Sequence, residues 1–282
     1  MTIPAPLDYP IIAITDVHGQ CKALRKLINR LSRLSDWHDS AIVLVGDYVD
    51  RGPDVRGTLD LILELKAKHP GGVWGVMGNH DLALVRAARL DEGPHCAYWN
   101  KRYYENYDHE RTFRSYLGRD LKSSKWDEEI EALREAMPSA HKQFLATLPW
   151  MVEASGHIFL HGGLSPELVQ TAEEQVVALR EQRWDESSLS AIPGTRTAEL
   201  WRNEYPVWLG ADKRLSDNPL PLPGRVQVTG HKPVSRAEAN HIRIRLDTSG
   251  GHGDPLTACL LSGAESAPVF IRSGEREMVK ES

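Results

Sequence analysis

Five short apolar runs in this chain each end in side chains that bind metal ions or phosphate. The runs read as buried β-strands, and the polar side chains follow directly where each run stops. Because ligands of α/β sheets gather outside the carboxyl ends of the strands, these side chains are expected to converge in space. The runs are Ile11–Thr15, Ala41–Val45, Val73–Met77, His157–Leu160 and Arg225–Thr229, and the segments that follow them are Asp16–Gly19, Gly46–Gly52, Gly78–Asp81, His161–Gly163 and Gly230–His231.

The first half of the chain alternates strand-like and helix-like segments. Between the first two apolar runs, leucine and isoleucine residues recur at helical spacing over Gln20–Leu34. A second helical pattern follows Pro53, and two glycines end that connection before the third run. Nearly continuous apolar strands separated by helices predict a parallel sheet covered on both faces, and hence the α/β class. Right-handed crossovers then place the three strand ends at one rim.

The region between Asp81 and His157 has a different composition. It is rich in aromatic and charged side chains, and its periodicity predicts amphipathic helices over Trp126–Met137 and Ser139–Leu148. We interpret residues 82–156 as a helical cap inserted into one domain that spans residues 1–282. The aromatic side chains have two compatible interpretations: they fill a satellite core, or they form a lid that recognises substrate. They are Tyr98, Trp99, Tyr103, Tyr104, Tyr107, Phe113, Tyr116 and Trp126.

The last part of the chain returns to a mixed pattern. A further helix is predicted over Glu173–Arg183, and a proline-rich connector leads into the last of the five strands. Alternating polar and apolar residues at Ile242–Leu246 and Leu256–Leu261 predict a closing antiparallel hairpin.

Composition excludes several classes of protein. A formal net charge of -5 argues against a protein that grips nucleic acid by bulk electrostatics. The three cysteines, Cys21, Cys96 and Cys259, are scattered and odd in number, which predicts free thiols in a reducing compartment. No apolar stretch approaches the roughly 20 residues that span a bilayer, and the first ten residues carry no signal-peptide pattern. We therefore expect a cytoplasmic protein that does not act at a membrane.

The polar residues at the strand ends form a plausible set of ligands for two metal ions. Asp16 and His18 are two residues apart, so both can face one cation, and Asp47 can bridge that cation to a second one. The second cation is completed by one amide and two imidazoles, from Asn79, His161 and His231. Oxygen and nitrogen ligands without a thiolate favour Mn, Fe or Zn, with Mn expected first. A bridging hydroxide formed there is the expected nucleophile for in-line attack on a phosphate ester.

Three other polar residues of these segments are expected to act on the substrate. His80 is the predicted general acid for the departing alkoxide, and Asp81 is predicted to hold its ring nitrogen. Arg51 can fork onto a non-bridging phosphate oxygen. Asp50 is expected to orient a ligand or Arg51 rather than to bind metal.

Taken together, the five segments resemble the phosphoprotein phosphatase branch of the calcineurin-like metallophosphoesterases. The matching motifs are Asp-x-His-Gly, Gly-Asp-x-Val-Asp-Arg-Gly, Gly-Asn-His-Asp, His-Gly-Gly and Gly-His, and the resemblance spans Ile11 to Leu261. It implies a four-layer α/β/β/α sandwich with two mixed sheets. It also implies the ligand set given above, with Asn79 near the substrate phosphate, His80 and Asp81 as the acid pair and Arg51 as a phosphate clamp.

Departures from the motifs refine this resemblance. Eukaryotic serine/threonine phosphatases usually carry Glu where this chain has Asp81, and their Ser-Ala-Pro-Asn-Tyr segment is replaced here by Leu246–Gly251. Together with the stretch Pro138–Leu145, these features resemble the bacterial-type, Rhizobiales-like phosphatases. The family also uses a second phosphate-binding arginine, for which Arg202 and Arg196 are both candidates.

Three hypotheses about function follow. The first is a phosphatase that hydrolyses phosphomonoesters on protein Ser/Thr or Tyr side chains. The alternative is a symmetrical diadenosine tetraphosphatase or another nucleotide phosphohydrolase, in which the insertion stacks a base through Tyr98, Trp99, Tyr103 or Tyr104. The third, a phosphate-sensing scaffold without catalysis, is disfavoured because the acid pair and all six ligands are present.

Overall fold

The computed structural model describes residues 6–91, 97–166, 168, 170–182, 206–209, 218–253 and 255–274. Its first sheet has the order β10-β9-β1-β2-β3, with β1 at Ile11–Ile14, β2 at Ala41–Leu44, β3 at Val73–Gly75, β9 at Thr257–Leu261 and β10 at Val269–Arg272. Strands β1, β2 and β3 are parallel, with Ile11 opposite Ala41 and Ile42 opposite Val73. Strand β9 runs antiparallel to both β1 and β10, so the sheet is mixed.

The second sheet has the order β4-β5-β6-β8-β7. Its strands are β4 at Met151–Glu153, β5 at His157–Leu160, β6 at Val226–Thr229, β7 at Glu238–Ala239 and β8 at Arg243–Arg245. Strands β5, β6 and β8 are parallel, and the two outer strands are antiparallel to their neighbours. The chain therefore has two mixed sheets flanked by helices, as the resemblance implied, and not one open parallel sheet.

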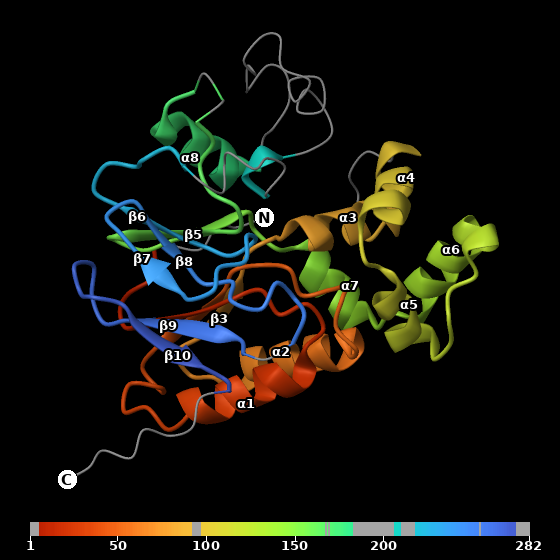
Figure 1. The fold of residues 1–282 in the computed structure, drawn as a ribbon, viewed down its shortest axis with the longest axis horizontal. Helices are drawn as coiled ribbons and strands as arrows, with labels where there is room; N and C mark the ends of the chain where they lie inside the picture. Colours follow the sequence, from red (N-terminus) through yellow and green to blue (C-terminus); the bar gives the residue numbers. More distant parts are fainter. Residues whose placement is uncertain are drawn as a thin grey trace.

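Helices cover the outer faces of these sheets. Helices α1 (Cys21–Leu31) and α2 (Val55–Lys68) lie beside the first sheet, and α8 (Ala172–Glu181) lies beside the second (Figure 1). Asp54 caps α2 by accepting from the Gly57 backbone N–H, and Thr171 and Glu174 form a capping box on α8. A short 3-10 helix, η2 (Val207–Leu209), precedes the second half of the second sheet. None of the helices described is long and apolar enough to cross a membrane.

The hydrophobic core explains why the first strand lacks polar alternation. In β1, Ile11 and Ala13 pack into a cluster that also holds Phe159 and Val228 of the second sheet. Their neighbours Ile12 and Ile14 join the cluster that holds the leucines of α1. Successive residues of a strand point to opposite faces, so a strand between two buried layers must be apolar throughout.

The insertion is helical over most of its predicted length and lies to one side of the sandwich (Figure 1). It contains α3 (Asn79–Ala87), α4 (Ala97–Asn106), α5 (Glu110–Leu117), the 3-10 helix η1 (Ser123–Lys125), α6 (Trp126–Ala136) and α7 (Ser139–Ala146). Its last residues differ from the prediction, because Met151–Glu153 forms β4 at the edge of the second sheet.

Two sequence interpretations are settled by the packing. The two alternating segments near the end of the chain do not form a hairpin: β8 pairs with β6 and β7, whereas β9 pairs with β1 and β10 in the other sheet. Polar alternation identified strands there but carried no information about partners. The aromatic residues Trp99, Tyr103, Tyr107, Phe113 and Tyr116 are buried and continuous with the main core, and they do not form a separate satellite core.

Candidate metal centre

The strand-end segments bring the predicted ligands together through unusual backbone geometry. The turn residues His18, Asp47 and His231 have φ angles of 43°, 54° and 67°. Residues other than glycine rarely adopt positive φ, and such strain persists where the surrounding structure fixes it, often at functional sites. The backbone N–H groups of Val17 and His18 both donate to the Asp47 carbonyl, at 3.1 and 2.8 Å, which joins the ends of β1 and β2.

Backbone carbonyls fix the orientation of two ligand imidazoles. His18 Nδ1 lies 2.8 Å from the Val49 carbonyl oxygen, and His161 Nδ1 lies 2.8 Å from the Val45 carbonyl oxygen. A carbonyl oxygen only accepts, so each Nδ1 carries the proton and donates it. The Nε2 lone pair of each ring is then directed at the centre, as in metal-binding histidines whose second nitrogen is held by the protein.

Asp47 lies between the two groups of ligands. Its Oδ2 is 3.3 Å from His18 Nε2 and 3.2 Å from His161 Nε2. Asn79 Oδ1 completes the second group, at 3.1 Å from His161 Nε2 and 3.0 Å from His231 Nδ1. Several of these atoms are acceptors that face one another at contact distance, an arrangement that a bound cation stabilises.

The electrostatics of His161 identify a position that favours positive charge. Burial opposes the imidazolium form, but the carboxylates of Asp47 and Asp16 outweigh it and raise the pKa of His161 to about 10. At His231 burial dominates, together with repulsion from His161, and the pKa falls to about 3. A site that raises the pKa of one buried base so strongly also favours a divalent cation over an empty cavity.

Asp16 has a free ligand atom in the same region. Its Oδ2 accepts from the His231 backbone N–H at 2.8 Å, whereas its buried Oδ1 has no hydrogen-bond partner among the residues described. Burial, then the neighbouring Asp247 carboxylate, raises the pKa of Asp16 to about 8. Gly230 is needed beside it, because a Cβ atom there would lie 1.7 Å from Asp16 Oδ1. A buried carboxylate oxygen without a donor fits a metal ligand.

Among the residues that the structure describes, two groups of side chains meet the distance requirement for a shared ion. They are His18, Asp47 and His80, and Asp47, His161 and His231, with the ligand atoms of each group within 4.8 Å of one another. The second group and Asn79 agree with the predicted second site. In the first group His80 stands where the sequence predicted Asp16. His80 remains a predicted substrate-side residue, and its Nε2 lies 3.2 Å from Nη2 of Arg51, the predicted phosphate clamp.

The predicted pair of His80 and Asp81 is wrong. His80 Nδ1 instead contacts Asp50 Oδ2 at 2.7 Å. Both residues of the predicted pair lie in the first turn of α3, where consecutive side chains point in different directions. Asp81 serves the backbone: its Oδ2 accepts from the N–H groups of Asp47 and Gly78 at 2.8 and 2.9 Å, and its Oδ1 accepts from Tyr48.

Arg51 lies beside His18 and His80 and is held on several sides. Its Nη1 lies 3.2 Å from His18 Nε2 and donates to the Gly250 carbonyl oxygen at 2.8 Å. Its Nε donates to Asp108 Oδ2 at 3.2 Å. The segment that replaces the family's Ser-Ala-Pro-Asn-Tyr motif therefore supports the arginine through a backbone carbonyl. The two candidates for a second phosphate arginine, Arg196 and Arg202, lie outside the described residues.

The family model of the calcineurin-like phosphoesterases matches residues 9–248 of this chain. The chain belongs to this family. The oxygen and nitrogen donors described above fit the binuclear metal centre of that family.

Relatives and solved structures agree with this assignment. The chain is 36% identical over 77 residues to serine/threonine-protein phosphatase SIT4 of Candida albicans, and 36% identical over 76 residues to PP1-1 of Saccharomyces cerevisiae. Each match covers 27% of this chain and 24% of the relative, so only a quarter of either protein is compared. The shared part is therefore a family core and not a whole enzyme.

Structural likeness extends over nearly the whole chain. A crystal structure provisionally assigned as a diadenosine tetraphosphatase has a TM-score of 0.54 at 18% identity, and the match covers 96% of both chains. A cold-active protein tyrosine phosphatase has a TM-score of 0.53 at 18% identity, with 95% of this chain and 81% of that chain covered. At this identity the likeness shows a shared fold.

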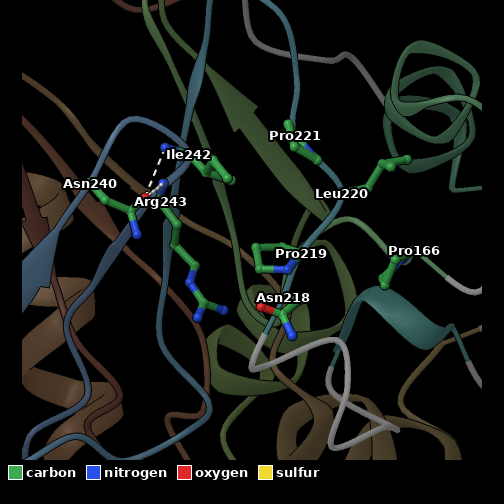
Figure 2. Close-up of a pocket in the computed structure, with 8 residues that line it drawn as sticks. All are labelled: Pro166, Asn218, Pro219, Leu220, Pro221, Asn240, Ile242 and Arg243. Atoms are coloured by element: carbon green, nitrogen blue, oxygen red, sulfur yellow. Dashed lines mark hydrogen bonds between the residues drawn. The ribbon is translucent and has the colours of Figure 1, made fainter.

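A cavity elsewhere on the second sheet contains none of the six predicted ligands. It has a volume of about 360 Å³ and is lined by residues that include Pro219, Pro221 and Arg243. Asn240 Oδ1 closes one wall by accepting from the backbone N–H groups of Ile242 and Arg243, each at 2.8 Å (Figure 2). This cavity is therefore distinct from the strand-end ligands.

Proposed function

We propose that this phosphoesterase hydrolyses phosphomonoesters on protein side chains, Ser/Thr or Tyr, with Mn²⁺ as its metal ion. The observation that carries the proposal is the placement of Asp47 between two ligand groups, with His80 and Arg51 in contact with each other beside His18. Two bound divalent cations supply Lewis acidity there, by lowering the pKa of water and by offsetting charge on the phosphate.

The protein's own residues supply orientation and proton transfer. Arg51 presents a planar fork of donors at the centre, which suits two oxygens of one phosphate group. His80 is held by Asp50, whose negative charge opposes the burial that lowers the pKa of His80. Its Nε2–H then donates to the oxygen that leaves with the side chain. Asn79, beside both ligand histidines, supports the phosphate from the second metal position.

Substrate class is the open choice within this chemistry. The sequence matches to serine/threonine phosphatases and the likeness to the tyrosine phosphatase fold favour phosphoproteins. The Pro138–Leu145 stretch and the replaced C-terminal motif favour the bacterial-type, Rhizobiales-like class within that group. The alternative is a diadenosine tetraphosphatase, favoured by the fold of the first structural neighbour.

A direct comparison of substrates tests the proposal. Purified protein with Mn²⁺ is assayed on a phosphoserine peptide, a phosphotyrosine peptide and diadenosine tetraphosphate at equal concentration. We expect kcat/KM to be highest for one of the peptides. Much faster hydrolysis of the dinucleotide would replace the proposed substrate class with the alternative.

A further inference from the structure

The turn at Asp50 and Arg51 lies in a strained conformation that the helical insertion holds in place. Both residues have positive φ, at 67° and 58°. The Asp50 backbone N–H donates to Thr112 Oγ1 at 3.0 Å, and the Arg51 backbone N–H donates to the Asp108 carbonyl oxygen at 3.1 Å. Strain of this kind persists only where neighbouring structure fixes it. Here the neighbouring structure is the segment that runs from α4 through α5.

The same segment fixes the Asp50 side chain, which is fully buried. Its Oδ1 accepts from the Thr112 hydroxyl at 2.6 Å and from the Tyr103 hydroxyl at 2.7 Å. Its Oδ2 accepts from His80 Nδ1 at 2.7 Å. A buried carboxylate is stable only when its oxygens receive donors, and these three define its rotation completely.

The orientation of Asp50 determines where His80 points. A histidine that donates Nδ1–H to a fixed carboxylate has a fixed ring plane, so the direction of Nε2 is also fixed. Tyr107, from the same segment, packs edge-on against the His80 ring with centroids 4.7 Å apart. Loss of the hydroxyls that hold Asp50 allows the carboxylate to rotate, and the imidazole with it.

We infer that Tyr103 and Thr112 are positioning residues of the phosphoesterase: their hydroxyls hold Asp50 and thereby direct His80 at the leaving oxygen. The inference rests on the proposed phosphomonoesterase function, and it gives the aromatic insertion a role in catalysis. Neither residue touches the phosphate. The Tyr103 hydroxyl acts through the Asp50 side chain, so its effect is on protonation of the leaving group, whereas Thr112 also holds the Asp50 backbone N–H.

The positioning role is tested by measuring how kcat depends on the leaving group of the substrate. Tyr103→Phe and Thr112→Val each remove a hydroxyl and keep the shape of the side chain. Their kcat is compared with wild type on an alkyl phosphate, whose leaving group needs a proton, and on p-nitrophenyl phosphate, whose leaving group needs little help. We expect kcat on the alkyl phosphate to fall by about 10- to 100-fold, as for partners that orient a functional group. For Tyr103→Phe, KM and the rate on p-nitrophenyl phosphate should change by less than about 3-fold. Thr112→Val also loses the acceptor of the Asp50 backbone N–H, so its loss should be larger on the alkyl phosphate than on p-nitrophenyl phosphate.

Two further variants serve as controls. Tyr116→Phe removes another buried tyrosine hydroxyl of the insertion, which lies 2.8 Å from His141 Nδ1. It should lower the melting temperature without changing the leaving-group dependence. Thr112→Ser keeps the hydroxyl and should restore most of the activity that Thr112→Val loses.

The outcomes separate the two levels of the proposal. If wild type hydrolyses neither phosphomonoester, the proposed function fails. If wild type is active but Tyr103→Phe and Thr112→Val lose both substrates equally, or lose no more than Tyr116→Phe, only the positioning role is overturned. Thermal melts and the metal content of each variant show whether a loss of rate comes from unfolding or from loss of the metal ions. A loss of rate with either cause also overturns the positioning role.

Discussion

Two hydrogen-bonded networks in this protein each contain one tyrosine, one histidine and one aspartate. The residues are connected in a different order in the two networks. In the site network, Tyr103 donates to Asp50, and Asp50 accepts from His80. In the remote network, the hydroxyl of Tyr116 contacts His141 Nδ1 at 2.8 Å, and His141 Nε2 lies 3.0 Å from Asp60 Oδ1.

The order of the residues decides what each network can do. With aspartate in the middle, one nitrogen of His80 is held and the other faces the metal centre. With histidine in the middle, both nitrogens of His141 have protein partners, and the ring joins α5, α7 and α2. The surroundings differ as well, since the Asp50 side chain is fully buried and that of Asp60 is 61% exposed. Composition alone therefore does not distinguish a catalytic network from a structural one.

The largest expected difference between the networks is in turnover. His80→Asn removes the general acid, and we expect kcat on an alkyl phosphate to fall by about 10²- to 10⁴-fold. His141→Asn removes only a structural contact and should change kcat by less than about 3-fold while lowering the melting temperature. Steady-state kinetics on the two variants test this, and equal losses would show that the remote network also takes part in catalysis.

The second-largest expected difference between the site network and the remote network is in stabilisation by metal binding. At a Mn²⁺ concentration of about 100 times its Kd, binding to the folded protein stabilises it by about 2.7 kcal/mol. We expect this stabilisation to raise the melting temperature of wild type and of His141→Asn. Asp47→Asn should abolish it, because Asp47 lies between both ligand groups. A thermal-shift titration measures the effect, and an unchanged shift in Asp47→Asn would remove Asp47 from the ligand set.

The two aspartates provide a smaller contrast. Asp50→Asn replaces the carboxylate that holds His80 with a neutral amide, and we expect kcat to fall by about 10- to 100-fold. Asp60→Asn should leave kcat unchanged within error, because its partner His141 does not face the centre. Comparing kcat and KM for both variants decides the point. A large rise in KM with unchanged kcat in Asp50→Asn would indicate a role in substrate binding instead.

The contrast between the networks also shows what the sequence could predict. Asp47, Asn79, His161 and His231 lie together in the structure because each follows an apolar strand, and strand ends converge. That rule needs only local sequence and a sheet, so the convergence of the second ligand group was predictable, whereas the two-sheet fold was implied by the family resemblance and not by the strand pattern. His80 and Arg51 follow the same rule, because they also belong to strand-end segments.

Contacts across the insertion could not be predicted in this way. Tyr103 and Thr112 reach Asp50 over 53 and 62 residues, and no local pattern specifies a hydrogen bond at that separation. Asp81 was assigned to His80 because the two are adjacent in sequence, yet adjacency in a helix separates side chains. Asp50, the true partner, belongs to the same motif as Asp47 and lies on another turn. The missing information was the packing of helices against that turn.

The smallest expected effect concerns the pH dependence of stability in the remote network. Burial lowers the pKa of His141 below its usual value of 6.5, although Asp60 opposes the shift. The unfolded chain therefore binds this proton at a higher pH than the folded protein does. Stability from neutral His141 is fully present above 6.5 and is lost as the pH falls from 6.5 through the folded pKa.

This prediction is measured as a difference between wild type and His141→Asn. Other titrating groups, including the metal ligands, are common to both proteins and cancel. We expect the gap in melting temperature between them to narrow as the pH falls from about 7 to about 5, where histidine titrates. A gap that widens instead would mean that the attraction of Asp60 for the imidazolium outweighs burial. The remote histidine would then be a charged residue when folded, as His80 is proposed to be during catalysis, and the electrostatic contrast between the networks would be lost.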